Sequence, residues 1–157
     1  MTIKTLEDLF VHDLSDIYSA EKQITRALPK MARAATDEKL IAAFQQHLEE
    51  TRGQIERIDQ LVESTEGVRI KRMKCHALEG LAEEAQEIID SVEAGPVRDA
   101  GLIGAAQKVE HYEIATYGTL HALATKLGYK DAARLLAETL KEEKATDEKL
   151  TIIAEQQ

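Results

Sequence analysis

Carboxylates interrupt the apolar lines of several long segments that have helical periodicity. When apolar residues are followed at alternating spacings of three and four, Glu21 falls in the middle of an otherwise apolar line. The same spacing places Glu110 with Glu113, and Glu143 with Asp147, on the apolar lines of two later segments. A lone carboxylate in an apolar core costs several kcal/mol, and clustered carboxylates also repel one another. Such acids must be protonated, paired with a base or neutralised by bound cations.

A fourth segment carries a less distinct polar line. His47, Glu50 and Gln54 lie one position away from an apolar line that includes Phe44 and Ile55. This spacing predicts Glu50 at the border of the core. His47 and Gln54 share that edge, so we rank both lower as metal ligands.

Distances along the chain place the acids at one height in the fold. Glu21 and Glu113 each lie about 15 residues before an expected hairpin turn, and Glu50 and Glu143 about 14 residues after one. At roughly 1.5 Å per residue, all four sit some 20–23 Å from their turns. The stretches HLEETRGQ and LKEEKATD also align, with Glu50 on Glu143. The equal spacings and this alignment therefore predict that the two hairpins are related by an internal pseudo-twofold axis, with the acids of both at one site.

Divalent cations neutralise such a cluster most simply, because no lysine or arginine lies on these lines at the level of the acids. We predict metal ligands in this order: Glu21, Glu50, Glu113 and Glu143, then Glu110 and Asp147, then Gln54 and His47. A buried network of acids, water and flanking bases remains the alternative. Tyr117, one turn after Glu113, is either a core tyrosine or a partner of a ligand.

Five helical segments would carry these residues, at about 6–34, 37–64, 76–92, 96–127 and 131–157. Pro29 is expected to kink the first, Thr36 or Asp37 to cap the start of the second, and Gly67 to cap its end. The segments form two antiparallel hairpins joined by a long connection. We therefore predict one all-α domain over residues 1–157, a four-helix bundle with a short extra helix in the crossover connection.

Composition narrows the classes of function. The chain has 29 acidic and 20 basic residues and a net charge of −9, which disfavours nucleic-acid binding. The basic run Arg69, Lys71, Arg72 and Lys74 is expected to be a solvated connection. The sequence contains no run of 18 apolar residues, so no membrane span is predicted. The N-terminal MTIKTLEDLF does not resemble a signal peptide. We expect a cytoplasmic protein, with Cys75 in no internal disulfide.

Several stretches resemble the YciF-like stress-response family of ferritin-like proteins over essentially the whole chain. They are SAEKQITRALPKMA, HLEETRGQIERID, KRMKCHALEGLAEEA, KVEHYEIATYGTL and ETLKEEKATDEKL. The resemblance implies a ferritin-like bundle, a dinuclear metal centre, a homodimer and a link to bacterial stress responses. It implies no particular reaction, so whether the protein is an enzyme stays open.

One departure from ferritin-like proteins concerns the ligands. Their metal helices carry Glu-x-x-His, which this sequence lacks; the i+4 partners of Glu50 and Glu143 are Gln54 and Asp147. An oxygen-rich set still suits two iron ions, or iron with manganese. Three hypotheses follow: a metalloprotein that reacts with peroxide or dioxygen, a structural or partner-binding bundle with a degenerate site, and an iron-storage shell.

Overall fold

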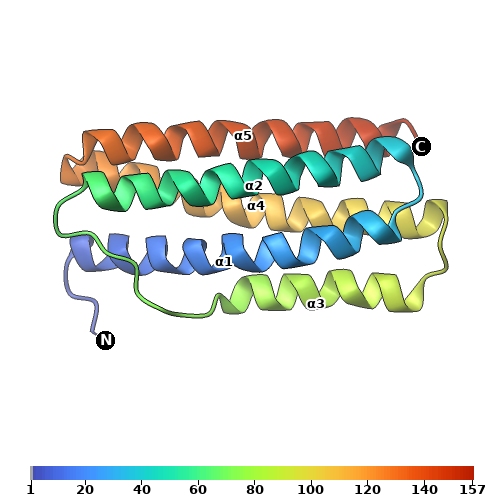
Figure 1. The fold of residues 1–157 in the computed structure, drawn as a ribbon, viewed down its shortest axis with the longest axis horizontal. Coiled ribbons are helices and arrows are strands. Elements are labelled where there is room, and N and C mark those ends of the chain that lie inside the picture. Colours follow the sequence, from blue (N-terminus) through green and yellow to red (C-terminus); the bar gives the residue numbers. More distant parts are fainter. Residues whose placement is uncertain (1) are drawn as a thin grey trace.

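The computed structural model describes residues 2–157 and contains five helices (Figure 1). They are α1 (Leu6–Ala34), α2 (Glu38–Ser64), α3 (His76–Ser91), α4 (Pro96–Leu127) and α5 (Lys130–Glu155). The helices α1, α2, α5 and α4 pack in that order around one core, and α3 covers the side formed by α1 and α4. The expected four-helix bundle with an extra helix in the crossover is confirmed.

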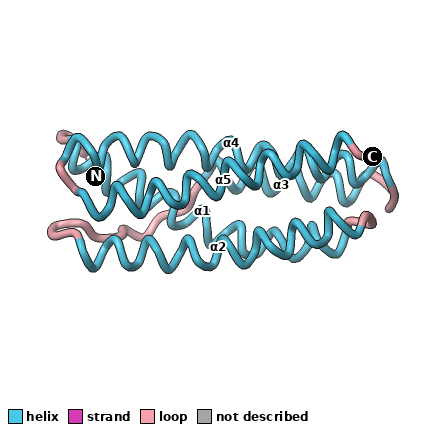
Figure 2. Tube along the Cα trace, turned by 90° about the horizontal axis from the view of Figure 1, so that it is seen from above, coloured by secondary structure: helices cyan, strands magenta, loops and turns pink. Residues whose placement is uncertain are grey.

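The direction of the helices follows from the connections. Two short turns make α1–α2 and α4–α5 antiparallel hairpins, whereas α1 and α5 run in the same direction (Figure 1). Loops lie at the two ends of the bundle, apart from the connection before α3, which runs along its side (Figure 2). This is the arrangement of four-helix bundles with one long crossover.

Local sequence signals set most helix ends. Thr5 caps α1 in a capping box with Asp8, and Asp37 caps α2 by accepting from the backbone N–H of Leu40. The expected cap at Gly67 is wrong, because α2 ends at Ser64 and Thr65 is already extended. Gly67 instead supplies the left-handed residue (φ +80°) of the turn that follows. The helix α1 continues through Pro29 to Ala34.

A buried aspartate links the two hairpins at one end. Asp99, in the first turn of α4, is 2 % exposed. It accepts hydrogen bonds from the backbone N–H groups of Thr36 (2.8 Å) and Asp37 (2.9 Å), and from the Thr36 hydroxyl (2.7 Å). These bonds hold the α1–α2 turn against α4. They therefore fix the relative height of the two hairpins, and with it the level of the central acids.

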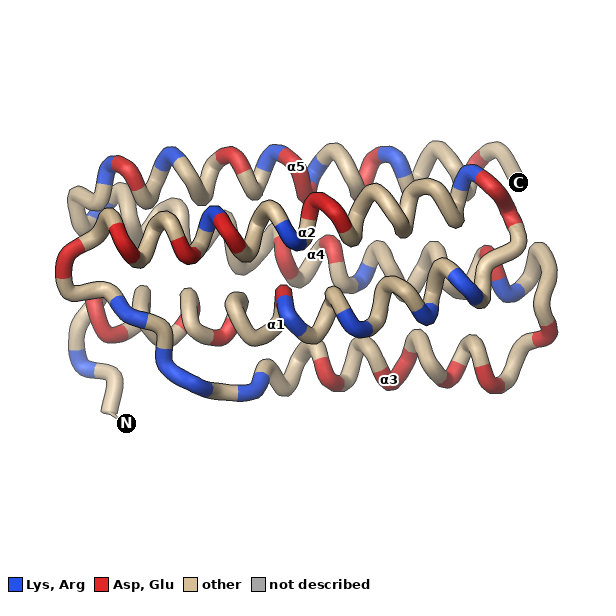
Figure 3. The backbone as a smooth tube through the Cα atoms, in the orientation of Figure 1, with Lys and Arg blue, Asp and Glu red and all other residues tan. Residues whose placement is uncertain are grey.

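Charge is segregated on the surface. The charged residues of α3 are Asp and Glu, whereas Lys and Arg lie along the C-terminal half of α1 and in the connection before α3 (Figure 3). Arg69, Arg72 and Lys74 are exposed in that connection. Among residues 2–157, no helix is long and apolar enough to cross a membrane.

Candidate metal centre

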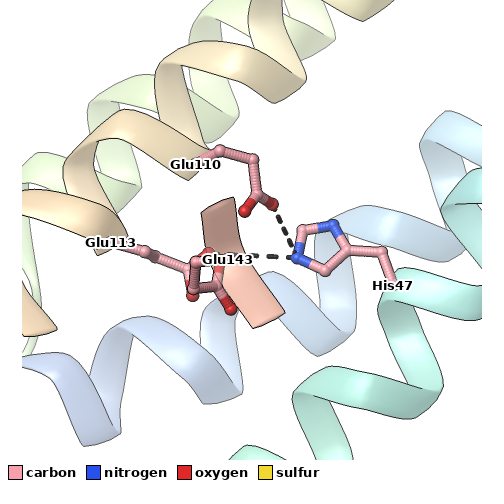
Figure 4. Close-up of side chains that lie close together, drawn as sticks. All are labelled: His47, Glu110, Glu113 and Glu143. Carbon is pink, nitrogen blue, oxygen red and sulfur yellow. Dashed lines mark ion pairs between the residues drawn. The ribbon is translucent and has the colours of Figure 1, made fainter. Parts of the chain in front are cut away.

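Four glutamates and a histidine occupy the middle of the bundle. His47 from α2, Glu110 and Glu113 from α4, and Glu143 from α5 each offer one ligand atom, all within 4.8 Å of one another (Figure 4). Glu21 from α1 interacts electrostatically with Glu113, Glu143 and His47. Each of the four long helices therefore contributes to one cluster.

These side chains are shielded from water and almost without hydrogen bonds. The four glutamates are at most 1 % exposed and His47 is 3 % exposed. Both carboxylate oxygens of all four glutamates lack a hydrogen-bond partner. Buried polar groups are normally hydrogen-bonded, and each unsatisfied one costs about 1–3 kcal/mol. A cluster of this size needs a compensating ligand or bound protons.

The protein itself offers little positive charge here. His47 Nε2 lies 2.8 Å from Glu110 Oε1 and 4.0 Å from Glu113 Oε1, which makes an ion pair only when the imidazole is protonated. Neither ring nitrogen makes a hydrogen bond of normal geometry. Arg57 is engaged elsewhere, with Glu142 (2.9 Å). One imidazole cannot neutralise four carboxylates.

Burial shifts the protonation of the acids. It raises the pKa of Glu21 and of Glu110 to about 8. Burial, followed by the charges of neighbouring glutamates, raises the pKa of Glu113 and Glu143 well above the usual range. Without a cation, the carboxyls therefore hold protons near neutral pH. Binding a divalent cation would displace those protons.

The structure places Glu50 at the rim of the cluster, where its charge contributes to the raised pKa of Glu110. Its carboxylate is half-buried and accepts from the hydroxyl of Thr146 (3.1 Å) and from Gln46 Nε2 (3.2 Å). His47 faces the centre in its place. The expectation that His47 lies at the edge of the core was therefore wrong.

The apolar line expected for α2 was displaced by about one position. The buried line runs through Leu40, Phe44, His47, Thr51, Gln54, Ile58 and Leu61. It alternates spacings of four and three without a break, which is the pattern of a core-facing seam. The sequence contains this regular spacing, but three residues on the line, His47, Thr51 and Gln54, are polar, so the line does not stand out as apolar.

Asp147 and Gln54 have partners of their own. Asp147 Oδ1 lies 3.1 Å from His111 Nε2, and the aspartate side chain is 23 % exposed. Gln54 is fully buried and donates to Glu142 Oε1 (3.1 Å), while its own Oε1 has no partner. Asp147 thus lies at the rim of the bundle, and Gln54 lies in the core.

The sequence is compatible with Tyr117 either as a satisfied core residue or as a partner of a ligand. Tyr117 is fully buried, and its hydroxyl makes no hydrogen bond of normal geometry, although it interacts with Glu21. Burial, and then the charges of Glu21, Glu113 and Glu143, raise its pKa well above 10. The phenol is therefore neutral and has a proton to donate.

The donor set fits metal ions. Carboxylate oxygens and one imidazole are ligands of iron and manganese, and the buried donor atoms make no hydrogen bond of normal geometry. The fold and the cluster together define a ferritin-like helical-bundle protein with a carboxylate-rich candidate metal site.

Residues 5–157 match the family described as Domain of unknown function (DUF892), and the chain belongs to this family. It is 68 % identical over 154 residues to Protein YciF of Escherichia coli K12, covering 98 % of this chain and 93 % of the relative. The resemblance to YciF-like proteins is therefore confirmed.

Solved structures agree with this assignment. The crystal structure of the E. coli stress protein YciF matches with a TM-score of 0.95 over 97 % of this chain and 96 % of that one. The Rhodopseudomonas palustris protein YcfI, for which a structural role has been suggested, matches with 48 % identity and a TM-score of 0.90 over 95 % and 94 % of the two chains. A Xanthomonas campestris protein with 24 % identity and a TM-score of 0.77 shares the fold.

Proposed function

We propose that the central cluster binds two metal ions, iron or iron with manganese, and that the protein uses them to react with dioxygen or peroxide in a bacterial stress response. The observation that carries the proposal is the set of four buried carboxylates that make no hydrogen bond of normal geometry and face a single imidazole. Its link to stress comes from the E. coli relative, which is a stress protein. We further propose that it acts as a cytoplasmic homodimer.

The ligands in this proposal come from all four long helices: Glu21, His47, Glu110, Glu113 and Glu143. Bound metal would supply Lewis-acid and one-electron redox chemistry. Glu50 and Asp147, at the rim, are placed to pass protons or cations between solvent and the cluster. Tyr117 keeps its proton and can donate a hydrogen bond to a ligand oxygen.

Metal removal tests the proposal directly. We expect a chelator to lower the melting temperature, because a ligand that binds only the folded state adds RT ln(1 + [L]/Kd), about 2.7 kcal/mol at hundredfold excess over Kd. In a domain of this size that corresponds to roughly 5–10 °C. Iron or manganese should restore the original value, and elemental analysis should find about two ions per chain. Identical melting curves with and without chelator would contradict the proposal.

That contradictory result would favour the second candidate, a structural or partner-binding bundle. The structural role suggested for the R. palustris relative is the observation in its favour.

Particle size separates both candidates from iron storage. Size exclusion with light scattering should give twice the 17.5 kDa of one chain. A hollow particle of about a dozen or more subunits would instead support a storage shell.

A further inference from the structure

Two hollows meet between α1 and α3 and lead toward the cluster. A groove of about 600 Å³ opens between these helices. Beneath it, a cavity of about 20 Å³ lies among α1, α3 and α4 and extends to His47. Ala27, Met31, Ala82 and Ala85 line both spaces. The two hollows therefore share one wall, which separates the surface groove from a cavity that ends at the imidazole.

The inner cavity is apolar apart from the imidazole at its end. Its other walls are the side chains of Ile24, Leu28, Leu78, Leu81, Ala106 and Val109. A volume of about 20 Å³ holds one molecule of roughly the size of water, but a site without polar partners stays dry. A hydroxyl that enters it loses hydrogen bonds at a cost of about 1–3 kcal/mol, and an anion loses more. Dioxygen has no such hydrogen bonds to lose.

A second approach to His47 has the opposite character. On the side formed by α2 and α5, a pocket of about 70 Å³ also reaches this histidine. Its lining includes the polar side chains of Gln46, Glu50, Thr146 and Lys149. Water, cations and peroxide find hydrogen-bond partners there. His47 thus stands between an apolar space and a polar one.

We propose that the gap between α1 and α3 is the route by which dioxygen, and not peroxide, reaches the cluster. This inference rests on the metal site proposed above. It names dioxygen as the oxidant that enters from the α1–α3 side of the bundle. His47 is 3 % exposed, and its Nε2 lies 2.8 Å from Glu110 Oε1, so the inner end of the route meets a side chain of the cluster itself. On the α3 side the wall between the two hollows consists of the small side chains of Ala82 and Ala85, so little side-chain volume separates the groove from the cavity.

The route can be examined in the metal-free protein. With methyl-labelled alanine and dissolved dioxygen under pressure, we expect stronger paramagnetic relaxation of the Ala85 and Ala106 methyls than of Ala124 and Ala132. All four are buried, but only the first pair lines the cavity. Ala82→Leu, at the half-buried mouth, should remove the difference. Equal relaxation of all four methyls in the unaltered protein would overturn the route.

The iron-loaded protein gives the second measurement. Ala82→Leu should slow oxidation of bound ferrous ion by dioxygen at least about tenfold, with unchanged metal content and little change in oxidation by peroxide. Ala27→Leu, on the opposite wall, should act in the same direction. Ala133→Leu on α5 is the matched control, because Ala133 is half-buried and lines neither hollow, so dioxygen should react at the original rate.

The results separate the two proposals. If dioxygen reacts equally fast in both plugged variants, the route is wrong even though the metal site stands. If the protein binds no metal, the proposed function fails, while methyl relaxation in the metal-free protein still decides whether dioxygen enters the cavity.

Discussion

Replacing Glu113 by alanine is expected to abolish binding of at least one metal ion while leaving the metal-free protein equally stable or more stable. In the metal-free state Glu113 is fully buried, and burial, followed by the charges of neighbouring glutamates, raises its pKa well above 4.5. While Glu113 stays protonated in the folded protein, each unit by which the pH exceeds the ordinary pKa of 4.5 costs the folded state about 1.4 kcal/mol. Alanine removes that cost. The small cavity that it leaves costs about 1–2 kcal/mol, so the balance is near zero or favourable.

A neighbouring pair of acids on α5 provides the control. Glu143→Ala should behave like the Glu113 variant, because Glu143 is 1 % exposed and belongs to the cluster. Glu142, the preceding residue, instead accepts from Arg57 (2.9 Å) and Gln54 (3.1 Å). Glu142→Ala should therefore lower stability by about 1 kcal/mol with or without metal, and leave metal content unchanged.

Elemental analysis and denaturant unfolding of each variant, with and without metal, complete this experiment. In a purely structural acid network, removing one member strands its partners and destabilises the protein throughout. The metal-site proposal is wrong if Glu113→Ala keeps its metal and loses several kcal/mol in the metal-free state.

Much of the cluster was predictable because acids in three helices interrupt clear apolar lines. Glu21, Glu110, Glu113 and Glu143 were expected in the core, and all four are buried there. The flanking residues of each line, such as Ile17 and Ile24 around Glu21, are buried as well. Periodicity is reliable in these helices because apolar neighbours fix which side faces inward.

The helix α2 shows where periodicity alone was ambiguous. Two lines, one through Leu48 and Ile55 and one through His47 and Gln54, run side by side along it. The structure buries the line through His47 and Gln54. The reason is that α2 packs against α1 on one side and α5 on the other, so its apolar residues are divided between two helix–helix contacts. The predicted pseudo-twofold pairing of Glu50 with Glu143 therefore does not extend to burial. Glu143 is buried, whereas Glu50 is half-buried.

Other features depend on contacts between segments far apart in the chain. The link from Asp99 to Thr36 requires α4 to lie against the α1–α2 turn, and the cavity that extends to His47 requires α3 to lie against α1 and α4. A short amphipathic helix in a crossover was predicted, but its apolar stripe cannot indicate which two helices it will cover. Only the packed structure shows that α3 covers the side next to His47.

The stability of the metal-free protein is expected to fall as pH rises from about 5 to 8. The pKa of Glu21 and of Glu110 is about 8 in the folded protein, against 4.5 for an ordinary glutamate. Between these values the folded state binds more protons than the unfolded state, so the free energy of unfolding decreases with pH. Their stabilising contribution is complete below pH 4.5 and is lost as pH passes through 8. The loss is on the order of several kcal/mol, a large part of the 5–15 kcal/mol typical of a domain.

Bound metal should reverse this dependence. Metal ligands must be deprotonated, so affinity rises with pH, and with it the stabilisation that a native-state ligand provides. Groups whose pKa is lowered by hydrogen bonds, such as Glu142, titrate below 4.5, so they do not change the free energy of unfolding between about pH 5 and 8. Unfolding by denaturant at pH 5, 6, 7 and 8, with chelator and with excess manganese, should therefore give two curves that diverge as pH rises. Glu21→Gln removes one titrating carboxyl and should flatten the metal-free curve. Metal-free stability that increases steadily from pH 5 to 8 would show that these carboxyls are already ionised in the folded protein, and that the cluster compensates their charge without a metal ion.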